Sequence, residues 1–170
     1  GTALLANYFT NNLSHTYTFS ESSNWTNAIF YSKINYFFDV EQERYKTASN
    51  FDANGTTPYY SMQFENSNFS TEIRAKSDYS KSFDNGSYLE LGGQYHNYHR
   101  YLDLQAENFN YDLSSWEPDP TFTNEFDFNE QIYSGYGNLN GEKSGITYSL
   151  GFRLEYTNRL IESFTINKKY

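Results

Sequence analysis

Two histidines stand close together in the segment YHNYHR, where the pair formed by His96 and His99 suggests a metal site. Residues three apart on a β-strand point to opposite faces of the sheet. If this segment is a strand, the two imidazole rings cannot chelate one ion together. We therefore predict one histidine on each face of the strand and no metal site.

Carboxylates are abundant in the segment EPDPTFTNEFDFNE, where Glu117, Asp119 and Asp127 could bind Ca²⁺. The segment lacks the ordered spacing and the glycine of an EF-hand loop, so a solvated acidic loop is the better interpretation. Asp127 and Glu130 could also form a catalytic pair, but nothing sets their separation or raises the pKa of either. No Ser-His-Asp order, phosphate loop or Gly-rich nucleotide turn is present. The sequence predicts no enzyme activity, no catalytic residue and no cofactor.

The chain's charge and cysteine content exclude several classes of protein. Its 170 residues carry a net charge of −9, with 12 Lys and Arg against 21 Asp and Glu. A nucleic-acid surface needs clustered positive charge, which is absent. The lack of cysteine excludes disulfide scaffolds and thiolate metal sites. No run of about 18 apolar residues exists, so no transmembrane helix is expected.

Aromatic residues make up 21% of the chain, although the hydrophobic content is only 37%. Leu, Ile and Val are scarce, and a soluble domain normally needs these branched residues for close packing. The wall of a membrane β-barrel has a polar lumen side, wet loops, and Tyr and Phe at the membrane interfaces. The composition therefore favours a barrel wall.

The segment ITYSLGFRLEYT, residues 146–157, alternates strictly between apolar or aromatic and small, polar or charged residues. Strict alternation predicts a β-strand whose two faces have different surroundings. Further strands are predicted over 14–20, 28–40, 69–79, 87–101 and 126–139. We predict that residues 1–13 form a loop or a poorly defined segment, and that 162–170 begin the next outer loop or strand.

The predicted connections alternate between short and long. Short turns are expected at 21–27, 84–86 and 138–145, and long connections at 43–58 and 103–124. Transmembrane barrels have short turns at one end and long loops at the other, whereas a soluble sandwich has no reason for this segregation. At the Asn85-Gly86 turn, a three-residue loop from Asp84 to Gly86 pairs Tyr79 with Leu91 and keeps apolar and charged residues apart.

Charged residues in the middle of strands are the most informative feature for function. A solvent-exposed sheet face would explain them, but the apolar opposite faces favour a barrel lumen. The predicted lumen-facing residues are Glu72, Arg74, Lys76, Asp78, Glu90, His96, Glu130, Arg153 and Glu155. The predicted lipid-facing residues are Ile73, Tyr79, Leu91, Tyr95, Tyr148, Leu150, Phe152 and Leu154.

The segments FDFNEQIYSGYGNL and YSLGFRLEYT resemble the outer-membrane β-barrel of TonB-dependent-receptor-like proteins from Bacteroidetes. The matching residues are Phe126, Glu130, Ile132, Tyr136, Gly151, Arg153, Glu155, Tyr156 and Thr157. The segment AKSDYSKSFDNGSYLELGGQY also resembles the family's preceding hairpin, with its Asp-Tyr pair at Asp78 and Tyr79. The resemblance covers roughly residues 60–160.

The resemblance implies the bacterial outer membrane and a barrel of about 22 strands closed around a plug domain. Eight strands is the usual minimum for a closed bacterial barrel, and this chain offers six or seven. We therefore expect an all-β, antiparallel up-and-down meander of about six strands. Residues 1–170 would form part of a larger transmembrane β-barrel wall. Its partners would be outer-membrane lipid, the rest of the barrel, a plug domain outside this chain and the TonB system.

The function expected from this reading is uptake of a solute, such as a metal chelate, glycan or peptide, through a plugged lumen. One alternative is a soluble or cell-surface antiparallel β-domain that binds glycans through exposed Tyr and Trp. Another is an outer-membrane protein with a structural or assembly role and no transport.

Overall fold

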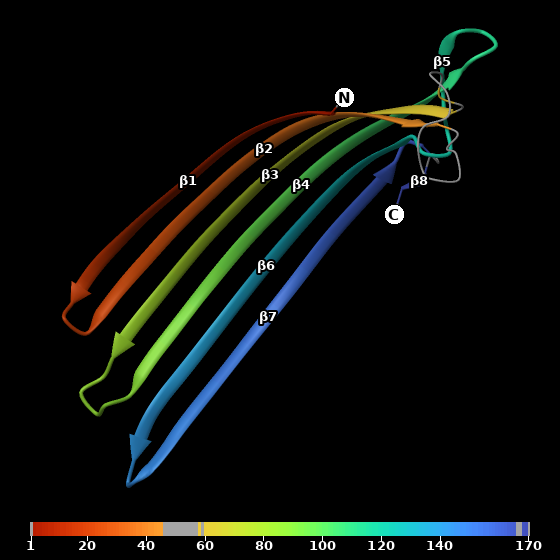
Figure 1. The fold of residues 1–170 in the computed structure, drawn as a ribbon. Coiled ribbons are helices and arrows are strands. Elements are labelled where there is room, and N and C mark those ends of the chain that lie inside the picture. Colours follow the sequence, from red (N-terminus) through yellow and green to blue (C-terminus); the bar gives the residue numbers. More distant parts are fainter. Residues whose placement is uncertain (1, 46–57, 59, 166–167, 170) are drawn as a thin grey trace, which may run out of the picture.

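The structure is a computed structural model that describes residues 2–45, 58, 60–165 and 168–169. It contains one antiparallel sheet whose long strands follow one another along the chain (Figure 1). The long strands are β1 (Thr2–Ser20), β2 (Ser23–Arg44), β3 (Tyr60–Ser82), β4 (Tyr88–Asn110), β6 (Asn124–Lys143) and β7 (Ile146–Ser163). Two short strands, β5 (Ser115–Pro118) and β8 (Lys168–Lys169), complete the sheet. The predicted all-β meander is confirmed.

The strands pair in the order β1-β2-β3-β4-β6-β7-β8, and β5 pairs back onto β4. Every long strand therefore lies beside its neighbour in sequence, as an up-and-down meander requires. Within the described residues, β1 and β8 form the two edges, so the sheet is open. No helix of the described part is long and apolar enough to cross a membrane.

The expectation that residues 1–13 form a loop or a poorly defined segment is wrong, because all described residues before Leu13 belong to β1. They pair continuously with β2, from Thr2 opposite Val40 to Leu13 opposite Ile29. Both alternating sets in this segment mix apolar and polar residues, so the sequence lacks the period-two contrast that marks a strand. Backbone pairing with β2 satisfies the N–H and C=O groups regardless of that contrast.

The predicted long connection over 103–124 is also largely wrong. Strand β4 continues to Asn110, and β5 folds back so that Trp116 lies opposite Phe109. Strand β6 starts at Asn124, which leaves short turns around this hairpin. The hydrogen-bond ladder between β4 and β3 continues, because this backbone pairing does not depend on side-chain polarity. Most of the predicted connection over 43–58 lies outside the described residues.

The short turns lie at one end of the sheet, as predicted. Three tight turns lie at this end, and the link from β4 to β6 lies at the other (Figure 1). Two of the tight turns are shorter than expected, because β2 begins at Ser23 and β6 extends to Lys143. The last turn contains only Ser144 and Gly145, both with positive φ, as a type I′ hairpin turn requires.

The hairpin between β3 and β4 has the predicted three-residue loop. Phe83 donates its N–H to the carbonyl of Ser87 at 2.8 Å, which encloses Asp84 to Gly86. Tyr79 lies opposite Leu91, as expected for this register. Gly86 closes the loop with a φ of 79°, a left-handed conformation that favours glycine.

Replacement of this glycine tests the turn. Gly86→Ala should lower the free energy of unfolding by about 1 kcal/mol, because a Cβ disfavours the left-handed conformation. A methyl group at this position would meet no heavy atom within 4 Å, so the effect isolates backbone strain. Urea titration of the folded protein in lipid vesicles measures the change. Asp84→Ala in the same loop is the control, and an equal loss there would contradict the explanation.

Candidate functional site

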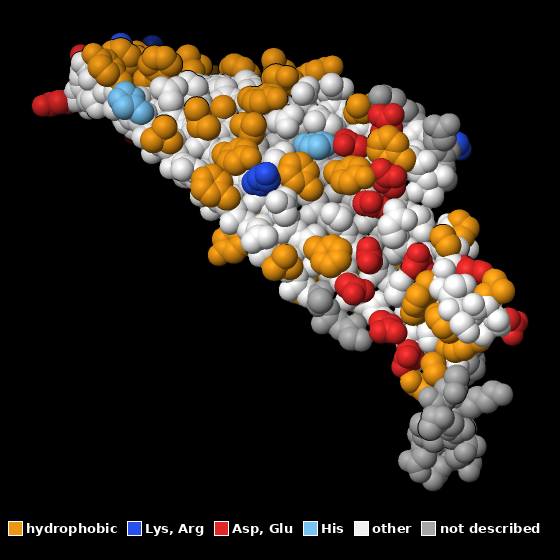
Figure 2. All heavy atoms as spheres, turned by 90° about the horizontal axis from the view of Figure 1, so that it is seen from above, with side chains coloured by type: hydrophobic (Ala, Val, Ile, Leu, Met, Phe, Trp, Pro, Cys, Tyr) orange, Lys and Arg blue, Asp and Glu red, His pale blue; other side chains and the backbone are white. Residues whose placement is uncertain are grey.

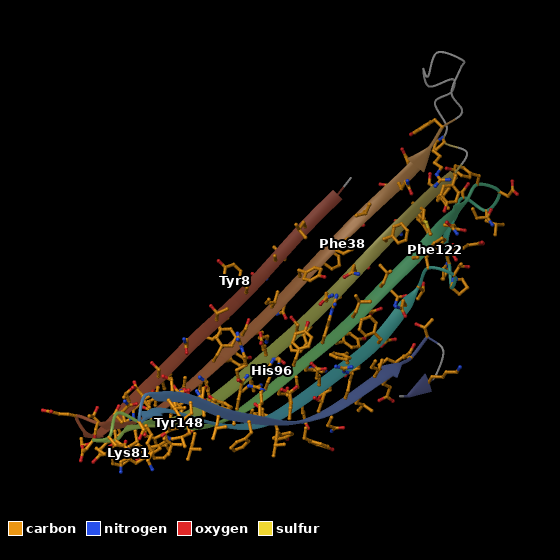
Figure 3. All side chains as sticks on the ribbon, turned by 90° about the horizontal axis from the view of Figure 1, so that it is seen from below. Tyr8, Phe38, Lys81, His96, Phe122 and Tyr148 are labelled. Carbon is orange, nitrogen blue, oxygen red and sulfur yellow. The ribbon has the colours of Figure 1, made fainter. Side chains whose placement is uncertain are left out.

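Cross-strand partners point to the same side of an antiparallel sheet, so the register defines two faces. We name them after adjacent residues of β7: the Arg153 face and the Leu154 face. On the Arg153 face, Asp78 lies in one row with Tyr136 and Arg153. Among the residues labelled in Figure 3, His96 in the middle of the sheet lies on the Arg153 face, and Tyr148 near the turns lies on the Leu154 face.

The register sorts the residues predicted to face the lumen or lipid onto these two faces. The residues predicted to face the lumen all lie on the Arg153 face: Glu72, Arg74, Lys76, Asp78, Glu90, His96, Glu130, Arg153 and Glu155. The residues predicted to face lipid all lie on the Leu154 face: Ile73, Tyr79, Leu91, Tyr95, Tyr148, Leu150, Phe152 and Leu154.

Opposite charges pair along single strands of the Arg153 face. Residues two apart on a strand share a face, which brings Arg74 Nε within 3.0 Å of a Glu72 oxygen. Arg153 and Glu155 form the equivalent pair on β7, at 3.1 Å. Because these side chains are roughly a third to a half exposed, each pair adds little stability, about 0–1 kcal/mol.

Other pairs join neighbouring strands. His96 Nε2 on β4 lies 3.0 Å from the same Glu72 oxygen on β3. Arg159 on β7 donates from Nε to a Glu130 oxygen on β6 at 2.7 Å. The pair places Glu130 on the charged face, as the sequence predicts. Arg159 was not singled out from the sequence, although it shares its parity with Arg153 and Glu155.

Tyr136 is the centre of a further cluster that the sequence reasoning missed as a site residue. Its hydroxyl donates to Asp78, whose carboxylate also accepts from Lys76 Nζ at 2.8 Å. Lys76 and Arg153 approach the ring at 5.9 and 5.8 Å from its centroid, which favours cation–π contact. The ring lies over Gly92, because no Cβ there blocks it.

The Arg153 face is hollowed near the turns. A hollow of about 710 Å³ runs across five strands, with Thr26, Lys76, Glu90, Tyr136 and Arg153 among its lining residues. Its mixed charges can hydrogen-bond water, a polar solute or a polar protein surface.

Strand β2 behaves differently from the other strands. Its alternating set Phe30, Tyr36 and Phe38 lies on the Arg153 face, while Lys33 and other polar residues lie on the Leu154 face. Arg74 covers the Phe30 ring at 4.3 Å, and Tyr36 accepts a hydrogen bond from the Asn68 amide at 2.9 Å. Alternation within β2 could not reveal its orientation, which depends on register with β3.

The polarity of both faces changes between the two ends of the sheet. On the Leu154 face, the half of the described strands near the turns carries no Asp or Glu, and carboxylates gather toward the loops (Figure 2). The first carboxylate on this face comes about 16 residues from the turn end in each of five long strands. These residues are Asp39, Glu65, Asp103, Asp127 and Glu162.

On the Arg153 face the distribution of carboxylates along the long strands is reversed, with carboxylates toward the turns and none toward the loops. Beyond the row that contains Arg100, these strands carry no carboxylate, and apolar residues such as Phe38, Phe64 and Leu104 dominate. Arg100 lies 5.9 Å from the centre of the Phe126 ring. The three-residue register of the β3–β4 hairpin also predicts a diagonal contact between Glu72 and Arg100. This contact is absent among the described contacts, because Glu72 pairs with Arg74 and His96 instead.

The residues considered for metal binding or catalysis are not assembled into one site. His99 pairs with Asp127 at 2.8 Å on the Leu154 face, and His96 lies on the opposite face. Asp119 accepts hydrogen bonds from the backbone N–H of Thr121 and the side chain of Asn108, and these lower its pKa. In the part of the chain that the structure describes, no three His, Cys, Asp or Glu side chains are placed to hold a metal ion.

Comparison with known proteins gives one match. A family model described as "Outer membrane protein beta-barrel family" matches residues 30–170, which include β3, β4, β6, β7 and most of β2. No curated protein matches the chain.

Proposed function

The chain belongs to the outer membrane protein beta-barrel family of the bacterial outer membrane, and from this premise we propose that it lines a solute-uptake pathway. In this proposal, residues 1–170 form part of the wall of a larger barrel. The Arg153 face lines the lumen, and the Leu154 face meets lipid near the turns. The observation that carries the proposal is that, in the half of the sheet near the turns, all described carboxylates of the long strands lie on the Arg153 face.

The open edges of the sheet support a larger barrel. Unpaired N–H and C=O groups of a strand cannot face hydrocarbon, because no water is there to bind them. The six long strands of the described residues are also fewer than the eight of the smallest closed bacterial barrels. Further strands beside β1 and β7 would satisfy both requirements.

The distance between the turns and the first carboxylates supports the membrane placement. A stretch of about 16 strand residues, tilted by about 40°, rises about 40 Å along the membrane normal. A bilayer with its headgroups is about 40–45 Å thick. The half of the Leu154 face that carries no Asp or Glu would therefore span the membrane, and Asp39, Glu65 and Asp103 would lie at or beyond the outer headgroups.

The lumen in this proposal is occupied by a plug domain and used by a solute that engages the mixed charges of the Arg153 face. A TonB-coupled receptor like those of Bacteroidetes fits this arrangement, which includes neither a catalytic step nor a cofactor. Lys76, Glu90 and Arg153 line the same hollow and offer both signs of charge to a plug or solute.

The alternative of a soluble glycan-binding β-domain does not fit the membership in this family or the exposed apolar surface. Leu150, Phe152 and Leu154 are each more than 60% exposed on one face. Contiguous apolar patches of this kind are rare on soluble monomers. The structural or assembly role without transport differs from our proposal in lacking a gated lumen.

Single cysteines can test the proposal, because the chain has none of its own. In the full-length protein in lipid vesicles, Glu90→Cys should react with a charged, water-soluble maleimide once the plug domain is deleted. Leu91→Cys, its neighbour on the other face, should stay unreactive in lipid and react only after unfolding.

Labelling of the intact protein distinguishes a transport role from a purely structural one. A plug should slow the labelling of Glu90→Cys relative to the plug-deleted form. Equal labelling of both forms would contradict a plugged lumen and favour the structural role. Fast labelling of Leu91→Cys in vesicles would contradict the assignment of the faces.

A further inference from the structure

A second hollow lies at the loop end of the Leu154 face, away from the charged lumen face. Its volume is about 320 Å³, within the range of small-molecule sites. Strands β2 and β3, the end of β4 and β5 form its walls. Its lining includes Glu41, Glu43, Ser61, Phe109, Tyr111 and Trp116.

Three aromatic rings of the β4–β5 hairpin form one side of this hollow. The Phe109 ring meets Trp116 at 5.2 Å and 71°, and Tyr111 at 4.9 Å and 75°. The rings meet at near right angles and together form an aromatic corner of the hollow. The Tyr111 hydroxyl hydrogen-bonds Ser61 Oγ at 2.6 Å, and this contact holds the hairpin against β3.

The opposite side of the hollow is acidic. Glu41 and Glu43 are two residues apart on β2, so both point to this face. Glu43 accepts a hydrogen bond from the Tyr45 hydroxyl at 2.5 Å, which fixes its position. Arg44, between them, points to the other face and covers the Tyr60 ring at 5.1 Å. Its guanidinium therefore does not fill the hollow.

We propose that this hollow binds a small organic cation, with an ammonium group held between the aromatic corner and the two glutamates. Aromatic faces attract cations through the negative potential of the ring, and desolvation strengthens the attraction. Nearby carboxylates add a Coulomb attraction of the same sign. The site is separate from the lumen and does not depend on what the barrel transports.

The charges of the two glutamates also discriminate between a free ammonium ligand and a lipid headgroup. A free quaternary amine such as choline carries only the positive charge. A lipid headgroup adds a phosphate, which Glu41 and Glu43 would repel. The proposal therefore commits to a free organic cation.

Calorimetric titration of the full-length protein in a non-ionic detergent tests the site. Choline should bind about tenfold more tightly than its uncharged isostere, in which carbon replaces nitrogen. Glycerophosphocholine should bind more weakly than choline. Equal binding of choline and its isostere, no binding of choline, or tighter binding of glycerophosphocholine would each overturn the proposal.

Variants assign the binding to this hollow. Trp116→Leu should weaken choline binding about tenfold, whereas Trp116→Phe, which keeps a ring, should weaken it less. Glu43→Gln should weaken choline binding but leave the isostere unaffected. Trp25→Leu, near the turns on the same face, is the matched control, and an equal loss there would overturn the assignment. Outer-membrane insertion of each variant reports folding independently, so failure here leaves the uptake proposal intact.

Discussion

Leu154→Arg is expected to destabilise this sheet in a bilayer by about 2–4 kcal/mol. Leu154 is 72% exposed and lies about halfway between the turn and the first carboxylate of β7. An arginine facing lipid near the midplane costs about 2–4 kcal/mol in transmembrane barrels. Urea titration of the full-length protein refolded into phospholipid vesicles measures the loss.

The control for this variant is a charge on the same strand but on the other face. Thr157→Arg places its guanidinium on the Arg153 face, two residues from Glu155 on the same strand. We expect its free energy of unfolding to change by less than about 0.5 kcal/mol, as for ordinary surface changes. Equal losses for the two variants would show that both faces have the same surroundings, and would reject the membrane orientation.

Gly92→Ala is expected to lower the free energy of unfolding by about 1–3 kcal/mol through overpacking. A methyl group at this position would lie 2.5 Å from a carboxylate oxygen of Asp78 and 2.5 Å from Cζ of Tyr136. Both atoms belong to the cluster on the Arg153 face, so relief of the clash breaks the hydrogen bond between Tyr136 and Asp78. The same vesicle titration measures this loss.

The next residue supplies the control. Gly93 points to the Leu154 face, where the nearest atom to an added methyl group would be the Ser134 carbonyl oxygen at 3.6 Å. Gly93→Ala should be neutral or slightly stabilising, because alanine restricts the unfolded chain. Adding Tyr136→Ser to Gly92→Ala should recover part of the stability. No recovery would show that the ring is not the source of the clash.

Local features of the sequence were enough to predict the strand type, the two-faced character and the β3–β4 hairpin. Side chains alternate with a period of two, so the segment from Ile146 to Tyr156 reveals its two sets without tertiary information. The same period restricts the register around Asp84 to Gly86, because a slip of one residue would mix charged and apolar faces. Lumen and lipid remain assignments for the labelling experiment to test.

Only the tertiary structure decided where strands end and which face an ambiguous strand presents. Strand β1 is held by backbone pairing with β2, and the loop end of β4 by backbone pairing with β3. Side-chain patterns do not encode this pairing. The orientation of β2 likewise follows from its register with β3. Tyr136 reaches Asp78 across β4 because Gly92 between them has no side chain. That contact joins residues 58 positions apart, and hydrogen bonding across three strands brings them together.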